Sequence, residues 1–484
     1  MKLDDASFSF CINNLSRDRA RDNFMDSGRL GTQSHARKHM SHFHESRLTL
    51  HLALPLMIGQ MSQMLLSVAD TLMVGHLGVT VLAALTFSTA LFHVPFVFGI
   101  GLLSGISVIT SSARGANDAR RARGSCRHGL YLALALGTVL FGISWIISLN
   151  LDHLGQPPEV AARTTVFFRI IMASIIPALA SIALKNHADA LNRPWPPFWI
   201  FLGGVTLNVG LNWVMIHGKF GCPVLGFEGA AWATLISRCA ILVAMFAWLL
   251  WVKDLHEWVP HRWIHWLDFS DFRRLLAIGF PSSLQMVSEV AAFSMAGLLM
   301  GRFGAEAMAA HQIAITLAGV AFMIPLGLSM ALTVRMGQAH GAGELHRLRP
   351  IAVSGWILAG IFSMVAASLF LFCGNFLASL FVRSPEVIAL TCSLLVVAGF
   401  FQFIDGVQVA SSAMLRGLHD IRVPAMVGFV AYWWVGLPAG AGLAFGLQLG
   451  PVGIWWGLAI GLFIALVALG PRLWKRTRCA TSSV

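Results

Sequence analysis

Long runs of apolar residues, separated by short polar segments, repeat along the chain from about residue 50 to residue 471. A helix that crosses a lipid bilayer needs about 20 mostly apolar residues. By that criterion the pattern predicts twelve membrane-spanning helices, at residues 50–75, 81–112, 129–150, 165–190, 197–217, 229–252, 275–300, 307–334, 351–373, 387–414, 424–447 and 451–471.

The composition agrees with this pattern. Of the 484 residues, 56% are hydrophobic and only 12% are charged, and the mean hydropathy is +0.72. Soluble domains are about 25% charged, and no single soluble core is large enough to bury this much apolar surface. The sequence therefore predicts an all-α polytopic membrane protein, and it excludes disordered, collagen-like and disulfide-scaffold classes.

Positive charge follows the expected membrane topology. The net charge of +12 at first suggests a nucleic-acid-binding protein. However, most of the 34 Lys and Arg residues fall in the two tails and in the loops after even-numbered spans. The loops after odd-numbered spans contain only Arg163, Lys219, Arg302 and Arg383. Because cytoplasmic loops are enriched in Lys and Arg, this bias places both termini in the cytoplasm and removes the case for a nucleic-acid partner.

Neither the ends of the chain nor the cysteines indicate an additional domain. Residues 1–45 are polar and lack the apolar stretch of a signal peptide, so we expect a disordered cytoplasmic tail there, and a second short tail at 473–484. The seven cysteines are scattered without a CxxC pair. They are expected to fill small apolar spaces between helices, with no metal site and no disulfide framework.

The chain contains an internal repeat. The stretch that begins at Pro55 matches the stretch that begins at Pro281, an offset of 226 residues. The same offset pairs Gly101 with Gly327 and continues without a gap as far as Gly341. Chance matching of small residues explains such an unbroken offset poorly, because it extends across two helices and the following loop.

The repeat divides the chain into two six-helix lobes, residues 46–252 and 274–472, joined by a cytoplasmic linker of mixed charge at 253–273. Because six is an even number, both lobes insert in the same direction and are related by a pseudo-two-fold axis along the membrane normal. Paired lobes around a midplane cavity are a common transporter design, in which the halves rock to give alternating access. Architecture alone does not establish transport.

Three carboxylates lie well inside predicted spans: Asp70 in the first, Glu289 in the seventh and Asp405 in the tenth. A charged group at the bilayer centre costs about 2.5–3.5 kcal/mol, so such residues usually face a wet cavity and handle ions, protons or cationic substrates. The alternative is a carboxylate that pairs with a nearby Arg or caps a broken helix. Glu289 and Asp405 have no Arg or Lys within about two turns on their own helices, which favours acids that bind cations.

Two amide side chains are candidate neighbours of Asp70. Asn208 and Asn212 lie four residues apart in the fifth predicted span and therefore share one helix face. Amide oxygens beside a carboxylate form a hard-oxygen site suited to Na⁺, or a hydrogen-bonded relay for a proton. Ordinary hydrogen bonding between helices explains two intramembrane asparagines equally well. The residues by themselves leave both interpretations open.

Several stretches of sequence together resemble one family of transporters. They are ADTLMVGHLG at 69–78, LNVGLNWVMIHGKFG at 207–221, GFEGAAWAT at 226–234, GFPSSLQMVSE at 279–289, MAAHQIA at 308–314 and DGVQVASSAMLRGLHDIRVP at 405–424. In this order and spacing they resemble the multidrug and toxic compound extrusion (MATE) family, NorM-like branch, over roughly residues 48–475. The resemblance implies a cation-coupled antiporter, driven by Na⁺ or H⁺, with two lobes arranged as a V. It would export organic, often cationic and amphipathic compounds such as drugs and dyes.

The resemblance also suggests which residues couple transport to a cation. Asp70, Asn208 and Asn212 are similar to the N-lobe cation site of the family, and Glu289 and Asp405 are similar to the C-lobe site of NorM-like members. For the substrate cavity, where aromatic rings can attract organic cations, we expect Gln285, Phe293, Phe401, Gln402 and Trp433. Phe401 lies one turn before Asp405, at a position where relatives can have a tyrosine, and it lacks that hydroxyl.

Two other functions remain as alternatives. A lipid or cell-wall-precursor flippase of the same broad superfamily would also have paired lobes, but it should have a basic groove for phosphates, and the intramembrane charges here are mainly acidic. An enzyme is disfavoured because the chain has no HExxH, GxSxG or Walker A motif. We expect no cofactor other than Na⁺ or H⁺ as coupling ion. The expected partners are small organic cations and membrane lipid. We expect the protein to be a monomer in a bacterial inner membrane.

Overall fold

The computed structural model describes residues 42–75, 79–150, 158–264, 266 and 268–479. These residues are almost entirely helical, and no strand is found among them. The first lobe contains α3 (His42–Gly75), α4 (Val79–Gly115), α5 (Ala119–Ser148), α6 (Pro158–Ala173), α7 (Ile175–Ala190), α8 (Trp195–His217) and α9 (Gly226–Trp251). After the short turn η2 (Lys253–Leu255), the second contains α10 (Phe269–Met300), η3 (Gly301–Phe303), α11 (Ala305–Gly341), α12 (Leu345–Ser379), α13 (Pro385–Gly417), α14 (Arg422–Phe429), η4 (Val430–Gly436), α15 (Leu437–Ala441), η5 (Gly442–Gly446) and α16 (Pro451–Cys479).

Eleven helical segments in the described part of the chain are long and apolar enough to cross a membrane. The remaining predicted span corresponds to α3, a 34-residue helix, whose side chains at 65–72 lie outside the described residues. The fourth span is interrupted at Ser174, between α6 and α7. The eleventh alternates between α-helix and the π-helical segments η4 and η5. The prediction of an all-α polytopic membrane protein is confirmed.

Three helices extend into segments predicted to be tails or the linker between the lobes. α3 begins at His42, inside the stretch predicted to be a tail at 1–45, and α16 continues to Cys479, inside the tail predicted at 473–484. α10 begins at Phe269, inside the predicted linker at 253–273. A criterion based on apolar residues misses these ends because their charged side chains are held by ion pairs or face solvent. The remaining tail residues, 1–41 and 480–484, lie outside the described residues.

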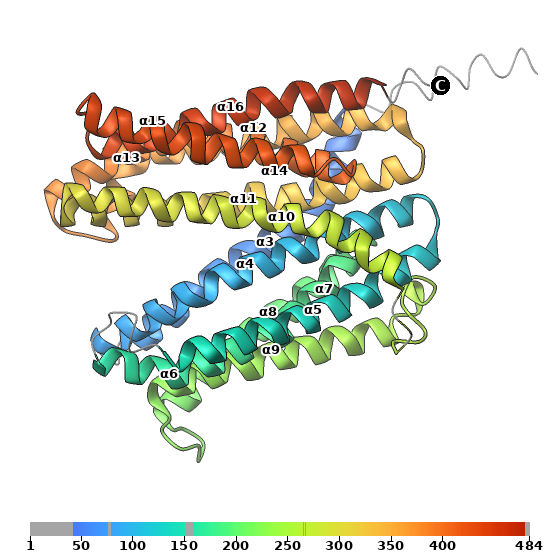
Figure 1. Ribbon diagram of the computed structural model, residues 1–484, viewed down its shortest axis with the longest axis horizontal. Helices are drawn as coiled ribbons and strands as arrows, with labels where there is room; N and C mark the ends of the chain where they lie inside the picture. Colours follow the sequence, from blue (N-terminus) through green and yellow to red (C-terminus); the bar gives the residue numbers. More distant parts are fainter. Residues whose placement is uncertain (1–41, 76–78, 151–157, 265, 267, 480–484) are drawn as a thin grey trace, which may run out of the picture.

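The helices form two groups (Figure 1). We call α3–α9 the N-lobe and α10–α16 the C-lobe. The two groups converge at the end of the molecule that holds the start of α3 and the end of α16, and they diverge toward the opposite end. We call the end where they converge the closed end.

Contacts between the lobes follow the two-fold relation of the sequence repeat. A Cβ atom at Gly101 of α4 would lie 2.4 Å from the Cα atom of Ser283 on α10. A Cβ atom at Gly327 of α11 would lie 2.5 Å from the Cα atom of Met57 on α3. The partners in the second contact are each 226 residues from their counterparts in the first. Reciprocal contacts of this kind are the mark of a two-fold interface, and small residues allow its backbones to approach closely.

A second reciprocal pair of contacts lies at the closed end. Gly115 at the end of α4 lies against the backbone of Gln338, and Gly341 at the end of α11 lies against the backbone of Ser112, again with an offset of 226 residues. The side chain of Gln338 also accepts a hydrogen bond from Asn192 of the N-lobe, at 3.1 Å. The lobes are therefore joined here by backbone packing and by polar side chains.

The start of α3 is tied to the C-lobe through Glu45, whose side chain is fully buried. Arg335 of α11 and Arg347 of α12 both bind its carboxylate, and Arg347 Nε lies 3.0 Å from Glu45 Oε1. Arg335 also donates to the Glu45 carbonyl and the Thr49 hydroxyl, each at 2.6 Å. Burial opposes ionisation, but the hydrogen bond from Arg347 and the charges of both arginines hold the pKa of Glu45 below its usual value.

Candidate functional site

Two of the predicted acids are brought together inside the C-lobe. Glu289 on α10 and Asp405 on α13 lie within electrostatic range of each other. Asp405 is only 3% exposed, and Glu289 is half-buried. Neither acid forms an ion pair with a described residue. Arg416, near the end of α13, contributes a positive potential at Glu289 from beyond ion-pair distance.

The hydroxyl of Tyr432 lies beside this pair of acids. Tyr432 is buried and hydrogen-bonds to the carboxylate of Glu289, and it also lies within electrostatic range of Asp405. It belongs to η4, and π-helical turns of this kind are rare and frequent at functional sites. The sequence analysis did not select Tyr432 as a site residue. The signal that could have found it is its rarity, because the chain has only two tyrosines.

The position of Tyr432 bears on the missing hydroxyl at Phe401. The ring of Phe293 lies between the two residues, with its centroid 5.8 Å from that of Phe401 and 6.0 Å from that of Tyr432. Phe401 also packs edge-to-face against Trp455, at 5.9 Å. A phenolic oxygen therefore lies next to the acids, but it belongs to Tyr432 on η4 and not to residue 401 on α13.

Several polar atoms around the acids have no hydrogen-bond partner among the described residues. They include Asp405 Oδ1, both amide atoms of Gln402 and Gln285 Oε1. Gln402 is fully buried. It lies one turn from Asp405, and Gln285 lies one turn from Glu289, so each amide shares a helix face with an acid. Because buried polar atoms are nearly always paired with protein or with water, this cluster can accept water or a cation.

The predicted cavity residues divide into two groups. Gln285 and Phe293 are half-buried and lie one turn of α10 before and after Glu289. Trp433 is also half-buried, and its indole nitrogen donates to the hydroxyl and the carbonyl of Ser288, at 2.9 and 3.2 Å. Phe401 and Gln402 lie in the lobe interior, with 3% and 0% exposure. In this conformation the first group is therefore more accessible than the second.

In the N-lobe, the two predicted asparagines form part of a hydrogen-bonded chain. Asn212 Nδ2 donates to Asn208 Oδ1 at 3.1 Å, and Asn208 Nδ2 donates to the hydroxyl of Thr234 on α9 at 3.3 Å. Thr234 was not among the predicted residues. Asp70 belongs to α3, which packs against α8, but its side chain lies outside the described residues. Its place beside the asparagines therefore stays a prediction.

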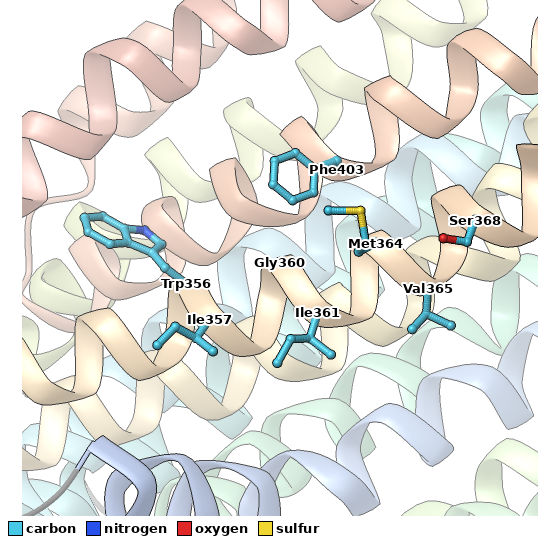
Figure 2. A pocket seen from close by; sticks show the side chains of 8 residues that line it. All are labelled: Trp356, Ile357, Gly360, Ile361, Met364, Val365, Ser368 and Phe403. Carbon is cyan, nitrogen blue, oxygen red and sulfur yellow. The ribbon is translucent and has the colours of Figure 1, made fainter.

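Two cavities in the described part of the chain lie elsewhere. One, of about 550 Å³, opens on the outer surface between α12 and α13 (Figure 2). The other, of about 220 Å³, is polar and lies at the closed end. Its lining includes Arg114, Asn192, Arg335, Gln338 and Arg347. Neither is lined by a residue predicted for the substrate cavity.

A polytopic protein with two repeated six-helix lobes and a cluster of acids buried in one of them has the architecture of a secondary transporter. The MatE family model matches residues 55–214 and 281–441, which is one segment in each lobe. The chain belongs to this family, the MATE transporters. Members of the family are transporters and not enzymes.

Individual relatives agree with this assignment. The chain is 36% identical over 421 residues to the "Probable multidrug resistance protein NorM" of Bradyrhizobium diazoefficiens, covering 86% of this chain and 90% of that relative. Its fold is similar to that of the eukaryotic MATE transporter AtDTX14, with a TM-score of 0.82 and 21% identity over 91% of this chain and 99% of the other. It is equally similar to a multidrug resistance MATE family transporter of the MOP superfamily in an outward-facing conformation. There the TM-score is 0.82 and the identity 21%, over 90% of this chain and 96% of the other.

Proposed function

We propose that this protein is a cation-coupled exporter of organic, often cationic compounds, and that Glu289, Asp405 and Tyr432 form its coupling site. The observation that supports this most strongly is the pair of acids in the C-lobe, which has no ion-pair partner among the described residues. Two carboxylates in apolar surroundings cannot both remain charged without a cation. A proton or Na⁺ supplied from one side of the membrane meets that requirement.

Coupling follows from competition at this site. The oxygens of Glu289, Asp405 and Tyr432 can bind a small cation, while Phe293 and Trp433 beside them can attract an organic cation through their aromatic faces. One pair of acids cannot stabilise both cations fully at once. Entry of the small cation therefore releases the organic compound, and the difference in affinity between the two conformations drives the lobes to reorient.

The charge bias also suggests which side of the membrane each end of the molecule faces. The bias of Lys and Arg supports a closed end that lies on the cytoplasmic side of the membrane, which we take to be a bacterial inner membrane. The end at which the lobes diverge (Figure 1) would then face outward, as in the outward-facing relative. Asp70, Asn208 and Asn212 would form a second cation site in the N-lobe. The name of the NorM relative, a probable multidrug resistance protein, supports drugs as substrates.

Ethidium efflux from a pump-deficient bacterial host tests the proposal. Cells that express the wild type receive an imposed Na⁺ gradient or an imposed H⁺ gradient, and Glu289→Gln, Asp405→Asn and Asp70→Asn are compared at matched membrane expression. The matched control is Asp254→Asn, which removes an exposed carboxylate paired with Arg193. We expect one gradient to drive efflux, the two C-lobe variants to fall to the level of the empty vector, and the control to behave as wild type.

Two outcomes would contradict the proposal. Efflux that persists in both Glu289→Gln and Asp405→Asn would exclude the C-lobe acids as the coupling site. No efflux from well-expressed wild type, under either gradient, would exclude ethidium-type export and favour a flippase of the same superfamily.

A further inference from the structure

The cavity between α12 and α13 is an apolar groove on the outer surface of the C-lobe (Figure 2). Its lining includes Trp356, Gly360, Met364 and Ser368 of α12, and Phe403 of α13. Met364 points toward the ring of Phe403 on the neighbouring helix. Gly360 has no side chain, so the space between its backbone and the Phe403 ring stays open. The groove follows α12 for twelve residues, which is about 18 Å of helix. That length is close to one leaflet of the hydrocarbon core, about 15 Å deep.

A continuous aromatic path joins one end of this groove to a basic side chain. The indole of Trp356 stacks on that of Trp474 in α16, with ring centroids 6.3 Å apart and planes at 17°. The guanidinium of Arg349 lies over the ring of Trp474, 4.6 Å from its centroid. Arg349 precedes Trp356 by two turns of α12, so it lies about 10 Å further toward the closed end. Tryptophans between an apolar surface and a basic residue are typical of the membrane–water interface.

Arg349 differs from Arg347, Arg472 and Arg476 in having no acidic partner among the described residues. Arg472 and Arg476 of α16 both bind Asp420, and Arg347 binds Glu45 and Glu344. Among the described residues, no carboxylate lies within ion-pair distance of Arg349, and its Nε atom has no hydrogen-bond partner. A half-buried guanidinium held flat on an indole can still donate to an external anion.

We propose that this surface is a specific site for an anionic phospholipid, with its phosphate on Arg349 and one acyl chain in the groove. The charge of Arg349 complements a phosphate at the depth of the headgroups, and the groove matches an acyl chain in length and in character. The site lies on the lipid-facing side of the C-lobe and is independent of the coupling acids.

Native mass spectrometry of the full chain, purified in mild detergent, tests the site. The protein is titrated with phosphatidylglycerol or with phosphatidylcholine of identical acyl chains. A single basic residue near an anionic lipid contributes about 1 kcal/mol, so we expect wild type to prefer phosphatidylglycerol by about fivefold. Arg349→Gln should lower phosphatidylglycerol binding to the phosphatidylcholine level. Gly360→Leu, which adds bulk where a Cβ would meet only the Phe403 ring at 3.8 Å, should weaken binding of both lipids.

Matched controls distinguish the site from general effects of charge and bulk. Arg383→Gln removes an exposed basic residue beyond the far end of α12, and Gly142→Leu adds the same bulk at an open position on α5. Both should bind the two lipids as wild type does. Unchanged lipid binding in Gly360→Leu would show that no acyl chain occupies the groove. A retained preference for phosphatidylglycerol in Arg349→Gln would show that Arg349 does not bind the headgroup. Neither result depends on whether the protein exports ethidium.

Discussion

The two lobes repeat the same helices, but they hold their buried polar side chains in different ways. In the N-lobe, Asn212 donates to Asn208 and Asn208 donates to Thr234, so the amides form a chain of neutral hydrogen bonds between α8 and α9. In the C-lobe, Asp405 and Gln402 are buried as deeply, yet polar atoms of both have no partner among the described residues. The N-lobe amides are linked to one another and to a hydroxyl by hydrogen bonds, whereas the C-lobe cluster has acceptors left over.

The backbone differs in the same direction. α8 is a regular helix, whereas the related eleventh span is interrupted by the π-helical segments η4 and η5. The first of these segments presents Tyr432 to Glu289. An unpartnered buried polar atom costs about 1–3 kcal/mol, so a fold retains such atoms where binding repays the cost. The contrast teaches that one repeated scaffold can link its buried polar side chains by hydrogen bonds in one lobe and leave acceptors open beside two acids in the other.

The largest expected effect comes from releasing the lobes from each other with Glu45→Gln. Removing one partner of a buried ion cluster leaves Arg335 uncompensated and should lower the free energy of unfolding by about 3–5 kcal/mol. The variant leaves Glu289, Asp405 and Tyr432 unchanged, so cation binding in the C-lobe should persist. The measurement is thermal unfolding of the purified protein, with Asp254→Asn as control because that exposed pair contributes about 0–1 kcal/mol.

The same variant has a defined pH signature. Because the pKa of Glu45 is lowered in the folded protein, its contribution is fully present above the unfolded value of 4.5 and is lost as the pH falls through the lower folded value. The difference in stability between wild type and Glu45→Gln should therefore shrink in acid. A difference that grows as the pH falls would contradict the assignment of a charged Glu45.

The next effect separates the lobes by their response to the coupling cation. A ligand at about 100 times its Kd stabilises the folded state by about 2.7 kcal/mol. We expect stabilisation of this size in wild type, its loss in Asp405→Asn, and most of it to remain in Asn212→Ala. Equal loss in the two variants would show that the N-lobe binds the cation as strongly as the C-lobe does.

A smaller effect is expected from Tyr432→Phe, which removes only the hydroxyl beside Glu289. A hydrogen bond to a charged group contributes about 1.5–3 kcal/mol, so the cation concentration for half-maximal efflux should rise about tenfold or more. The other tyrosine is the matched control, because Tyr131 donates to the carbonyl of Trp263, remote from the acids. If Tyr131→Phe shifted the cation dependence as much, the role of Tyr432 would be structural.

The smallest expected effect is that of Asn212→Ala on stability. Hydrogen bonds between membrane helices contribute about 0.6 kcal/mol on average and at most about 1.7 kcal/mol. We therefore expect a loss of about 1 kcal/mol in thermal unfolding and only a partial loss of efflux. Complete loss of efflux, as in Asp405→Asn, would remove the contrast between the lobes.

Much of the fold could be predicted from the sequence, because membrane helices are encoded locally by runs of apolar residues. The repeat also predicted the two lobes, since one offset relates Gly101 to Gly327. The ends of the helices were less predictable. Glu45 was assigned to a disordered tail because its partners, Arg335 and Arg347, lie about 300 residues away in sequence, and no local pattern indicates such an ion cluster.

The site was predictable only in part. A carboxylate in an apolar run is conspicuous, so Glu289 and Asp405 could be predicted as candidates from their positions in the sequence. Tyr432 and Thr234 were not predicted: the rarity of tyrosine in the chain does not indicate which residues lie near it, and a threonine in a membrane helix is ordinary. The change to π-helix at Val430–Gly436 has no simple sequence pattern. The three-dimensional arrangement, and not residue type, identifies these two side chains.

The reciprocal glycine contacts between the lobes have a genetic consequence. Each contact is encoded twice in one gene, once with the small residue in the first half and once with it in the second. A substitution at Gly101 distorts only one of the two copies of its contact, so it makes the halves unequal where they meet. The molecule thus resembles a homodimer whose two subunits are encoded in one gene. The two contact surfaces can differ in sequence only as far as they still pack against each other.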